Sequence, residues 1–150
     1  MKTDSAAPVL VPGDTEELDR ELLQVARDIA AVSWDLKALN TVIIDLRGRV
    51  SYTDFVIVCT GTSERQVNSL ARNIDDAMKQ AGRQSMGSEG TDNGRWALLD
   101  YGDIIVHIFH QNARKDYDLE RMWSDAPRVE LEDAPPELYG HFGAEQFEQA

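Results

Sequence analysis

The stretch Trp96–His110, WALLDYGDIIVHIFH, decides the fold more than any other part of the chain. Two apolar runs flank Tyr101 and Gly102, which predicts two strands joined by a tight turn as a β-hairpin. The hairpin leads into Arg114–Trp123, RKDYDLERMW, and we expect a final helix over about Asn112–Trp123. A hairpin followed directly by a short aromatic helix is typical of a mixed α/β domain.

The remaining elements lie upstream of this hairpin. Residues rich in β-branched side chains predict strands over Thr41–Leu46 and Phe55–Thr60, with a further short strand near Gln84–Gly87. A first helix is predicted from about Asp14, with Glu17 three residues later in a capping arrangement. A second is predicted between Ser63, which caps it with Gln66, and Gly82, which ends it. The sum is one α/β domain with a five-stranded mixed sheet and packed helices.

The two ends differ in composition from this domain. We expect residues 1–13, rich in Pro, Gly and small side chains, to form a flexible tail, and residues 14–124 to form the domain. Residues 125–150 combine prolines with acidic side chains, which predicts an acidic, extended or disordered tail.

The net charge of −12 belongs mostly to these ends. Residues 37–123 contain twelve acidic and eleven basic side chains, so the expected core is almost neutral. Binding of free nucleic acid needs clustered Lys and Arg that displace counterions from phosphates, and that clustering is absent. We therefore expect no direct recognition of a nucleic-acid sequence, and an acidic protein that meets a basic protein surface.

Cysteine usage and hydropathy favour a cytoplasmic location. Cys59 is the single cysteine, so no internal disulfide can form, which is typical of a reducing cytoplasm. No apolar run approaches the roughly 18 residues that a membrane span needs. The N-terminal sequence also lacks the basic and hydrophobic pattern of a secretory signal.

Catalytic chemistry finds little support in the residues. Ser63 follows a strand where helix N–H groups could hold a phosphate, and Asp100 and Asp103 lie close in sequence. Metal-dependent nucleotidyl transfer through these three residues is one alternative, but we favour a capping serine and two turn aspartates, because both roles are standard for these residue types. His107 and His110 fall on opposite faces of a strand. We therefore expect no metal site, no cofactor and no enzyme activity.

Trp96 permits two interpretations. On a strand, Trp96, Leu98 and Asp100 share one face. A tryptophan of average behaviour would lie in the core. The alternative is an exposed anchor, because a tryptophan beside an acidic residue is typical of a binding hot spot.

The ordered motifs of the chain resemble a known family. They are Asp54–Val67, DFVIVCTGTSERQV; Glu89-Gly90; Arg95-Trp96; Leu99–His107, LDYGDIIVH; and the spaced set Arg114, Tyr117, Leu119, Glu120 and Trp123. Across about Thr15 to Ser124 the sequence resembles the ribosomal silencing factors, also called the RsfS or Iojap family. The resemblance implies a fold related to nucleotidyltransferases but without their catalytic carboxylates.

The resemblance also implies a function and a surface. Such a protein binds the large ribosomal subunit through ribosomal protein L-fourteen and sterically blocks subunit joining, which represses translation. Off the ribosome it forms a homodimer. Carried onto this chain, the partner surface centres on Trp96 and Asp100, with Leu98 and Glu89 nearby and Tyr101 at the turn; His107 is expected to be structural. A dimeric interaction module with another partner is a third possibility.

Overall fold

The computed structural model describes residues 12–91 and 93–140. One five-stranded sheet forms the centre, in the order β2-β3-β6-β5-β4. Its strands are β2 (Leu39–Asp45), β3 (Phe55–Gly61), β4 (Gly87–Glu89), β5 (Trp96–Asp100) and β6 (Ile104–His110). The helices are α1 (Pro12–Asp35), α2 (Glu64–Gln80), the single turns α3 (Gln111–Arg114) and α4 (Leu119–Met122), and the 3-10 turn η1 (Pro136–Leu138). The expected single α/β domain with a mixed sheet is confirmed.

The pairing of the strands explains their burial. β3 and β6 are parallel neighbours in the middle of the sheet, and all seven residues of β3 are buried. The pairs β2–β3, β5–β6 and β4–β5 are antiparallel. A continuous apolar run such as Phe55–Cys59 is typical of a strand that is covered on both faces. Other parts of the chain must therefore pack against each face of the sheet.

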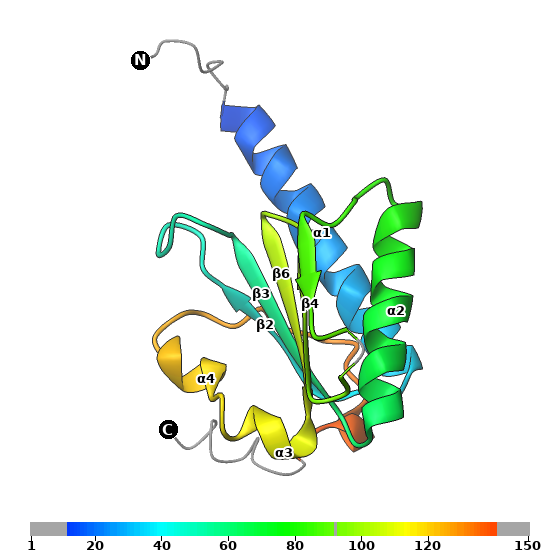
Figure 1. Ribbon diagram of the computed structural model, residues 1–150. Helices are drawn as coiled ribbons and strands as arrows, with labels where there is room; N and C mark the ends of the chain where they lie inside the picture. The colour runs from blue at the N-terminus through cyan, green and yellow to red at the C-terminus, as the bar shows by residue number, and fades with distance from the viewer. Residues whose placement is uncertain (1–11, 92, 141–150) are drawn as a thin grey trace.

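The two faces are covered unequally. The long helices α1 and α2 lie against one face, whereas the other carries only the short α3 and α4 (Figure 1). The helix side holds the larger cluster of buried apolar residues. The second side holds a smaller cluster of Ile44, Leu46, Val56, Val58, Phe109, Ala113, Leu119 and Ala126. Part of the second face of the sheet is therefore left accessible to solvent.

The ends of α2 follow the sequence signals. Ser63 is the N-cap, and its Oγ accepts a hydrogen bond of 3.1 Å from the backbone N–H of Gln66. The side-chain Oε1 of Gln66 accepts in return from the N–H of Thr62, at 2.7 Å. Gly82, with φ +80°, follows the helix. Helix N–H groups that lack intrahelical partners are satisfied here by local side chains.

Several element boundaries differ from those predicted. α1 begins at Pro12, so Asp14 lies within the helix rather than at its cap, and residues 1–11 lie outside the described part. The strand expected near Gln84–Gly87 is β4 at Gly87–Glu89, paired with β5. The hairpin turn is centred on Gly102-Asp103, since the N–H of Tyr101 bonds to the carbonyl of Ile104.

The single final helix expected over Asn112–Trp123 was wrong. The chain forms two separate turns, α3 and α4, with Asp118 as the N-cap of the second. Buried Arg114 and Glu120 bond to each other across the break, which draws the ends of the two turns together. Asp116 and Asp118 also favour turns over helix interiors.

Residues 125–140, which the sequence predicts to be extended or disordered, run along the domain and bond to it. The N–H of Asp45 donates to the carbonyl of Pro127 at 2.8 Å, and that of Val129 donates to the carbonyl of Ile43 at 2.9 Å. Leu138 is buried, and Val129 packs against the helix-side core. Residues 125–140 therefore cover the outer edge of β2, which would otherwise expose unpaired backbone groups. Residues 141–150 lie outside the described part.

Candidate functional site

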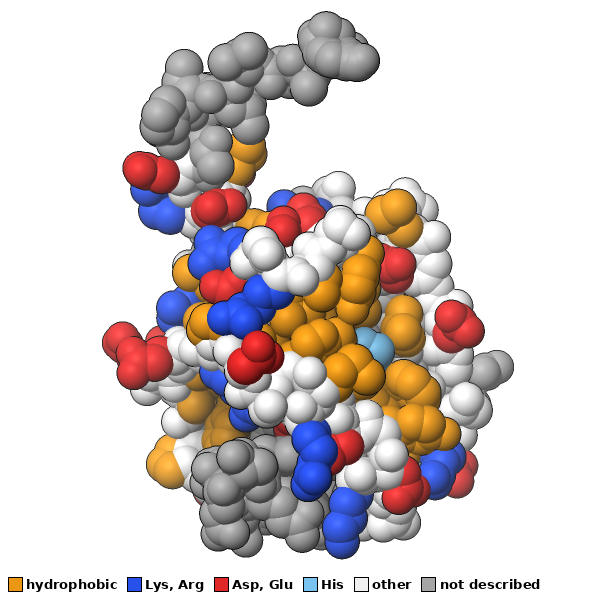
Figure 2. Space-filling view, turned by 90° about the vertical axis from the view of Figure 1, so that its left-hand side faces the viewer, with side chains coloured by type: hydrophobic (Ala, Val, Ile, Leu, Met, Phe, Trp, Pro, Cys, Tyr) orange, Lys and Arg blue, Asp and Glu red, His pale blue; other side chains and the backbone are white. Residues whose placement is uncertain are grey.

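Strand alternation gives β5 two different faces. Trp96, Leu98 and Asp100 share the more open face of the sheet, as the sequence predicted, and each of them is half-buried there. Ala97 and Leu99 point the other way and are buried in the core under the helices. The side of the molecule that carries α4 shows hydrophobic side chains gathered around a histidine (Figure 2). The candidate site is built on this open face.

Trp96 is neither a core residue nor a free surface residue. Its ring centroid lies 5.1 Å from that of Phe109 and 4.4 Å from that of Tyr117. Its indole N–H donates a hydrogen bond to Nδ1 of His107 at 3.1 Å. Because its one polar group is satisfied within the protein, Trp96 presents an apolar ring in a fixed orientation.

His107 holds Trp96 from the neighbouring strand. Leu98 and His107 are register partners across β5 and β6, and His107 is only 7% exposed. Burial lowers the pKa of His107 to about 4, so the imidazole is neutral near pH 7. A neutral imidazole can keep Nδ1 as an acceptor for the indole N–H. His107 was expected to be structural, but its role in positioning Trp96 was not predicted, because that role depends on strand register.

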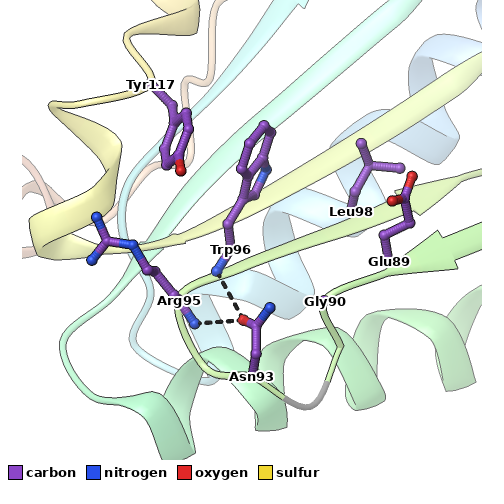
Figure 3. A pocket seen from close by; sticks show the side chains of 7 residues that line it. All are labelled: Glu89, Gly90, Asn93, Arg95, Trp96, Leu98 and Tyr117. Carbon is purple, nitrogen blue, oxygen red and sulfur yellow. Dashed lines mark hydrogen bonds between the residues drawn. The ribbon is translucent and has the colours of Figure 1, made fainter.

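A hollow of about 300 Å³ adjoins Trp96. Figure 3 shows the seven residues that line it, which are Glu89, Gly90, Asn93, Arg95, Trp96, Leu98 and Tyr117. Glu89 lies directly beside Leu98, because the two are register partners of β4 and β5. The expected neighbours Glu89, Leu98 and Trp96 therefore do meet at one place.

The loop before β5 shapes the hollow. Oδ1 of Asn93 accepts hydrogen bonds from the backbone N–H groups of Arg95 at 2.9 Å and Trp96 at 3.3 Å (Figure 3). Gly90 has φ +68°, and a Cβ there would lie 2.1 Å from the carbonyl oxygen of Trp96. Only glycine fits so close an approach. Asn93 was not singled out from the sequence; its place in a polar loop with two glycines was the only signal.

Two residues of the expected surface lie elsewhere. Asp100 shares the face of Trp96, but its Oδ1 accepts from the N–H of Gly102 at 2.8 Å and it does not line the hollow. Tyr101 is 7% exposed, and its hydroxyl donates to Oδ1 of Asp75 on α2 at 2.7 Å. One step beyond Asp100, alternation turns Tyr101 toward the helices. The structure therefore removes Tyr101 from the predicted surface.

The alternative catalytic set is not assembled. Ser63 follows the carboxyl end of β3, whereas Asp103 precedes the amino end of its parallel neighbour β6. Six residue steps of strand, about 20 Å, separate these ends of the sheet. Ser63 is engaged as a helix cap, and Asp103 pairs with Arg83 at 3.4 Å. Ser63, Asp100 and Asp103 therefore cannot share one substrate.

Within residues 12–91 and 93–140, no group of three or more His, Cys, Asp or Glu side chains is placed to hold a metal ion. Cys59 is buried in β3, and burial raises the pKa of its thiol to about 12.

Over residues 12–91 and 93–140, no helix combines the length and apolar character needed to cross a bilayer.

A protein-family model matches most of the chain. The family described as "Ribosomal silencing factor during starvation" matches residues 19–148. The ribosomal silencing factor RsfS of Halalkalibacterium halodurans is 40% identical over 114 residues, which cover 76% of this chain and 95% of that protein. RsfS of Bacillus subtilis is 37% identical over 113 residues, 75% of this chain and 93% of that protein.

Plant and structural relatives agree with this match. The chloroplastic protein Iojap of Zea mays is 32% identical over 114 residues, 75% of this chain and 49% of that protein. A crystal structure of protein CV0518 from Chromobacterium violaceum gives a TM-score of 0.66 at 31% identity, covering 73% of this chain and 91% of that one. A crystal structure from Bacillus halodurans gives 0.64 at 37% identity, covering 75% and 99%.

Proposed function

This chain belongs to the ribosomal silencing factor family, and from that membership we propose that it represses translation by occupying the large ribosomal subunit. The partner on the subunit is ribosomal protein L-fourteen, and the bound factor prevents the small subunit from joining. The free protein is a cytoplasmic homodimer. No step of this mechanism requires catalysis.

The observation that carries the proposal is the fixed, half-exposed ring of Trp96 beside a hollow. Binding energy in protein interfaces concentrates in aromatic and arginine residues that fill pockets in well-packed surroundings. A ring already held by Phe109, Tyr117 and His107 loses little side-chain entropy on binding. Trp96, Leu98 and Glu89 then form the centre of the partner surface, with Asp100 at its flank.

Charge supports a basic protein partner. The chain carries a net charge of −12, so it is attracted to a basic protein surface and repelled by exposed ribosomal RNA. Silencing itself follows from excluded volume, because two bodies cannot occupy one subunit interface. Its efficiency is set by the residence time of the factor, which depends mainly on the dissociation rate.

The test is sedimentation of the purified protein with separated ribosomal subunits. We expect co-sedimentation with the large subunit only, and fewer joined ribosomes when the small subunit is added afterward. Trp96→Ala should lose both effects, whereas Leu18→Ala, which truncates an exposed apolar residue on α1, should retain them. A folded Trp96→Ala protein that still binds would remove Trp96 from the site. Absence of wild-type binding to either subunit would overturn the proposed function.

A further inference from the structure

The hollow beside Trp96 combines an apolar wall with a carboxylate. Trp96 and Leu98 supply apolar surface, and the exposed Glu89 stands beside Leu98 (Figure 3). Figure 3 shows the Glu89 carboxylate and the Leu98 side chain adjacent on their two strands. Among residues 12–91 and 93–140, no hydrogen bond or ion pair engages the side chain of Glu89. Glu89 therefore remains available to an incoming group.

The one basic residue that lines the hollow is already engaged. Nη2 of Arg95 lies 3.2 Å from Oδ2 of Asp116, and both side chains extend into solvent. Arg95 therefore has a carboxylate partner of its own and does not neutralise Glu89. The charge that the hollow offers to a ligand is negative.

The volume suits one side chain rather than a cofactor. At about 300 Å³ the hollow is at the lower limit of small-molecule pockets, which span roughly 300–1,000 Å³. An apolar side chain placed there would cover Glu89 without giving it a partner, and burying an unpaired carboxylate costs free energy. An acidic side chain would be repelled. A neutral donor could bond to Glu89 but would leave its charge unpaired. A basic side chain fits the hollow best, with its aliphatic stem on Leu98 and its charge near Glu89 and Trp96.

We propose that this hollow receives a basic side chain of the ribosomal partner protein, and that Glu89 is its counter-ion. Arginine fits better than lysine, because its planar guanidinium stacks on aromatic rings and pairs with carboxylates through two hydrogen bonds. Asp100 does not take this role, because its carboxylate is bonded within the hairpin turn and lies outside the hollow. This inference rests on the proposed function and names the chemistry of the partner at the same site.

The experiment measures the affinity of Glu89→Gln and Glu89→Lys for the large subunit at several salt concentrations. Loss of one charge-assisted hydrogen bond should weaken binding roughly ten-fold in Glu89→Gln. Repulsion should weaken it further in Glu89→Lys. The salt dependence of Glu89→Gln should also be smaller than that of the wild type. Glu21→Gln, which removes an exposed carboxylate on α1, is the matched control and should bind as the wild type does.

A charge exchange identifies the partner residue. Exposed arginines and lysines of ribosomal protein L-fourteen are replaced one at a time by glutamate, and each variant is tested against Glu89→Lys. We expect one replacement to restore binding to Glu89→Lys while weakening binding to the wild type. Wild-type affinity of Glu89→Gln at every salt concentration, with Trp96→Ala inactive, would overturn this inference and leave the proposed function intact. Absence of wild-type binding would overturn both.

Discussion

The indole N–H of Trp96 donates to Nδ1 of His107 across the paired strands β5 and β6, at 3.1 Å. This bond exists only while Nδ1 carries no proton, because a protonated imidazole is a donor at both nitrogens. The geometry of the candidate surface therefore depends on a neutral histidine. Burial secures that state by lowering the pKa of His107 to about 4.

Stability should fall as the pH is lowered from about 6.5 to 4. An unfolded histidine titrates near pH 6.5, so in this window the unfolded chain binds a proton that the folded protein excludes. The loss of unfolding free energy is absent above pH 6.5 and reaches its full size below pH 4. The difference between the two pKa values sets that full loss at about 3 kcal/mol. Urea unfolding at a series of pH values measures it. His107→Gln lacks this titration and should show a shallower loss, so equal slopes for the two proteins would contradict the prediction.

The buried pair of Arg114 and Glu120 should be intolerant of single substitutions. Their side chains are 6% and 1% exposed, and Nη1 of Arg114 also donates to Oγ1 of Thr60 at 2.8 Å. Glu120→Ala leaves Arg114 buried without its counter-ion, so the free energy of unfolding should fall by about 3–5 kcal/mol. The double variant Arg114→Met, Glu120→Leu should recover part of this loss. Urea unfolding of the double variant and of its two singles, Arg114→Met and Glu120→Leu, measures the coupling. A double-variant loss equal to the sum of the two single losses would show that the pair is not coupled.

Local signals explain what the sequence predicts correctly. The strands Phe55–Gly61 and Trp96–Asp100 follow from β-branched or alternating apolar runs, and the Ser63 cap follows from side chains three residues apart. Such features depend on neighbours along the chain. The family resemblance adds a partner surface around Trp96, and that surface stays a prediction.

Long-range contacts explain what the sequence missed. The break between α3 and α4 depends on the pairing of Arg114 with Glu120 and with Thr60 on a distant strand. The role of His107 depends on the register between β5 and β6. The misplacement of Tyr101 has a simpler cause, since alternation along β5 already assigns it to the face opposite Trp96.

Cys59 should be inert in the native protein. It is fully buried in the central strand β3, and its pKa is raised to about 12 by burial. Since the thiolate is the reactive form, both access and ionisation oppose modification. Ellman's reagent should therefore release no thiolate colour near pH 8 until denaturant is added, and then one equivalent should react. Rapid reaction without denaturant would show that β3 opens readily.

The segment after α4 should contribute to the stability of the domain. The hydroxyl of Tyr139 donates to the carbonyl of Thr41 at 2.6 Å and accepts from the indole N–H of Trp34 at 3.1 Å. Tyr139→Phe removes both bonds, which should lower the free energy of unfolding by about 1–2 kcal/mol.

Truncation gives a stronger form of this test. A chain ending at residue 124 loses the backbone bonds to Ile43 and Asp45 and the buried Leu138, so it exposes the edge of β2. We expect it to unfold at clearly lower urea concentration than a chain ending at residue 140, and to aggregate through the uncovered strand. The chain ending at 140 is the matched control, because it keeps every contact of the described segment. Equal stability of the two would mean that the segment covers β2 without contributing to folding.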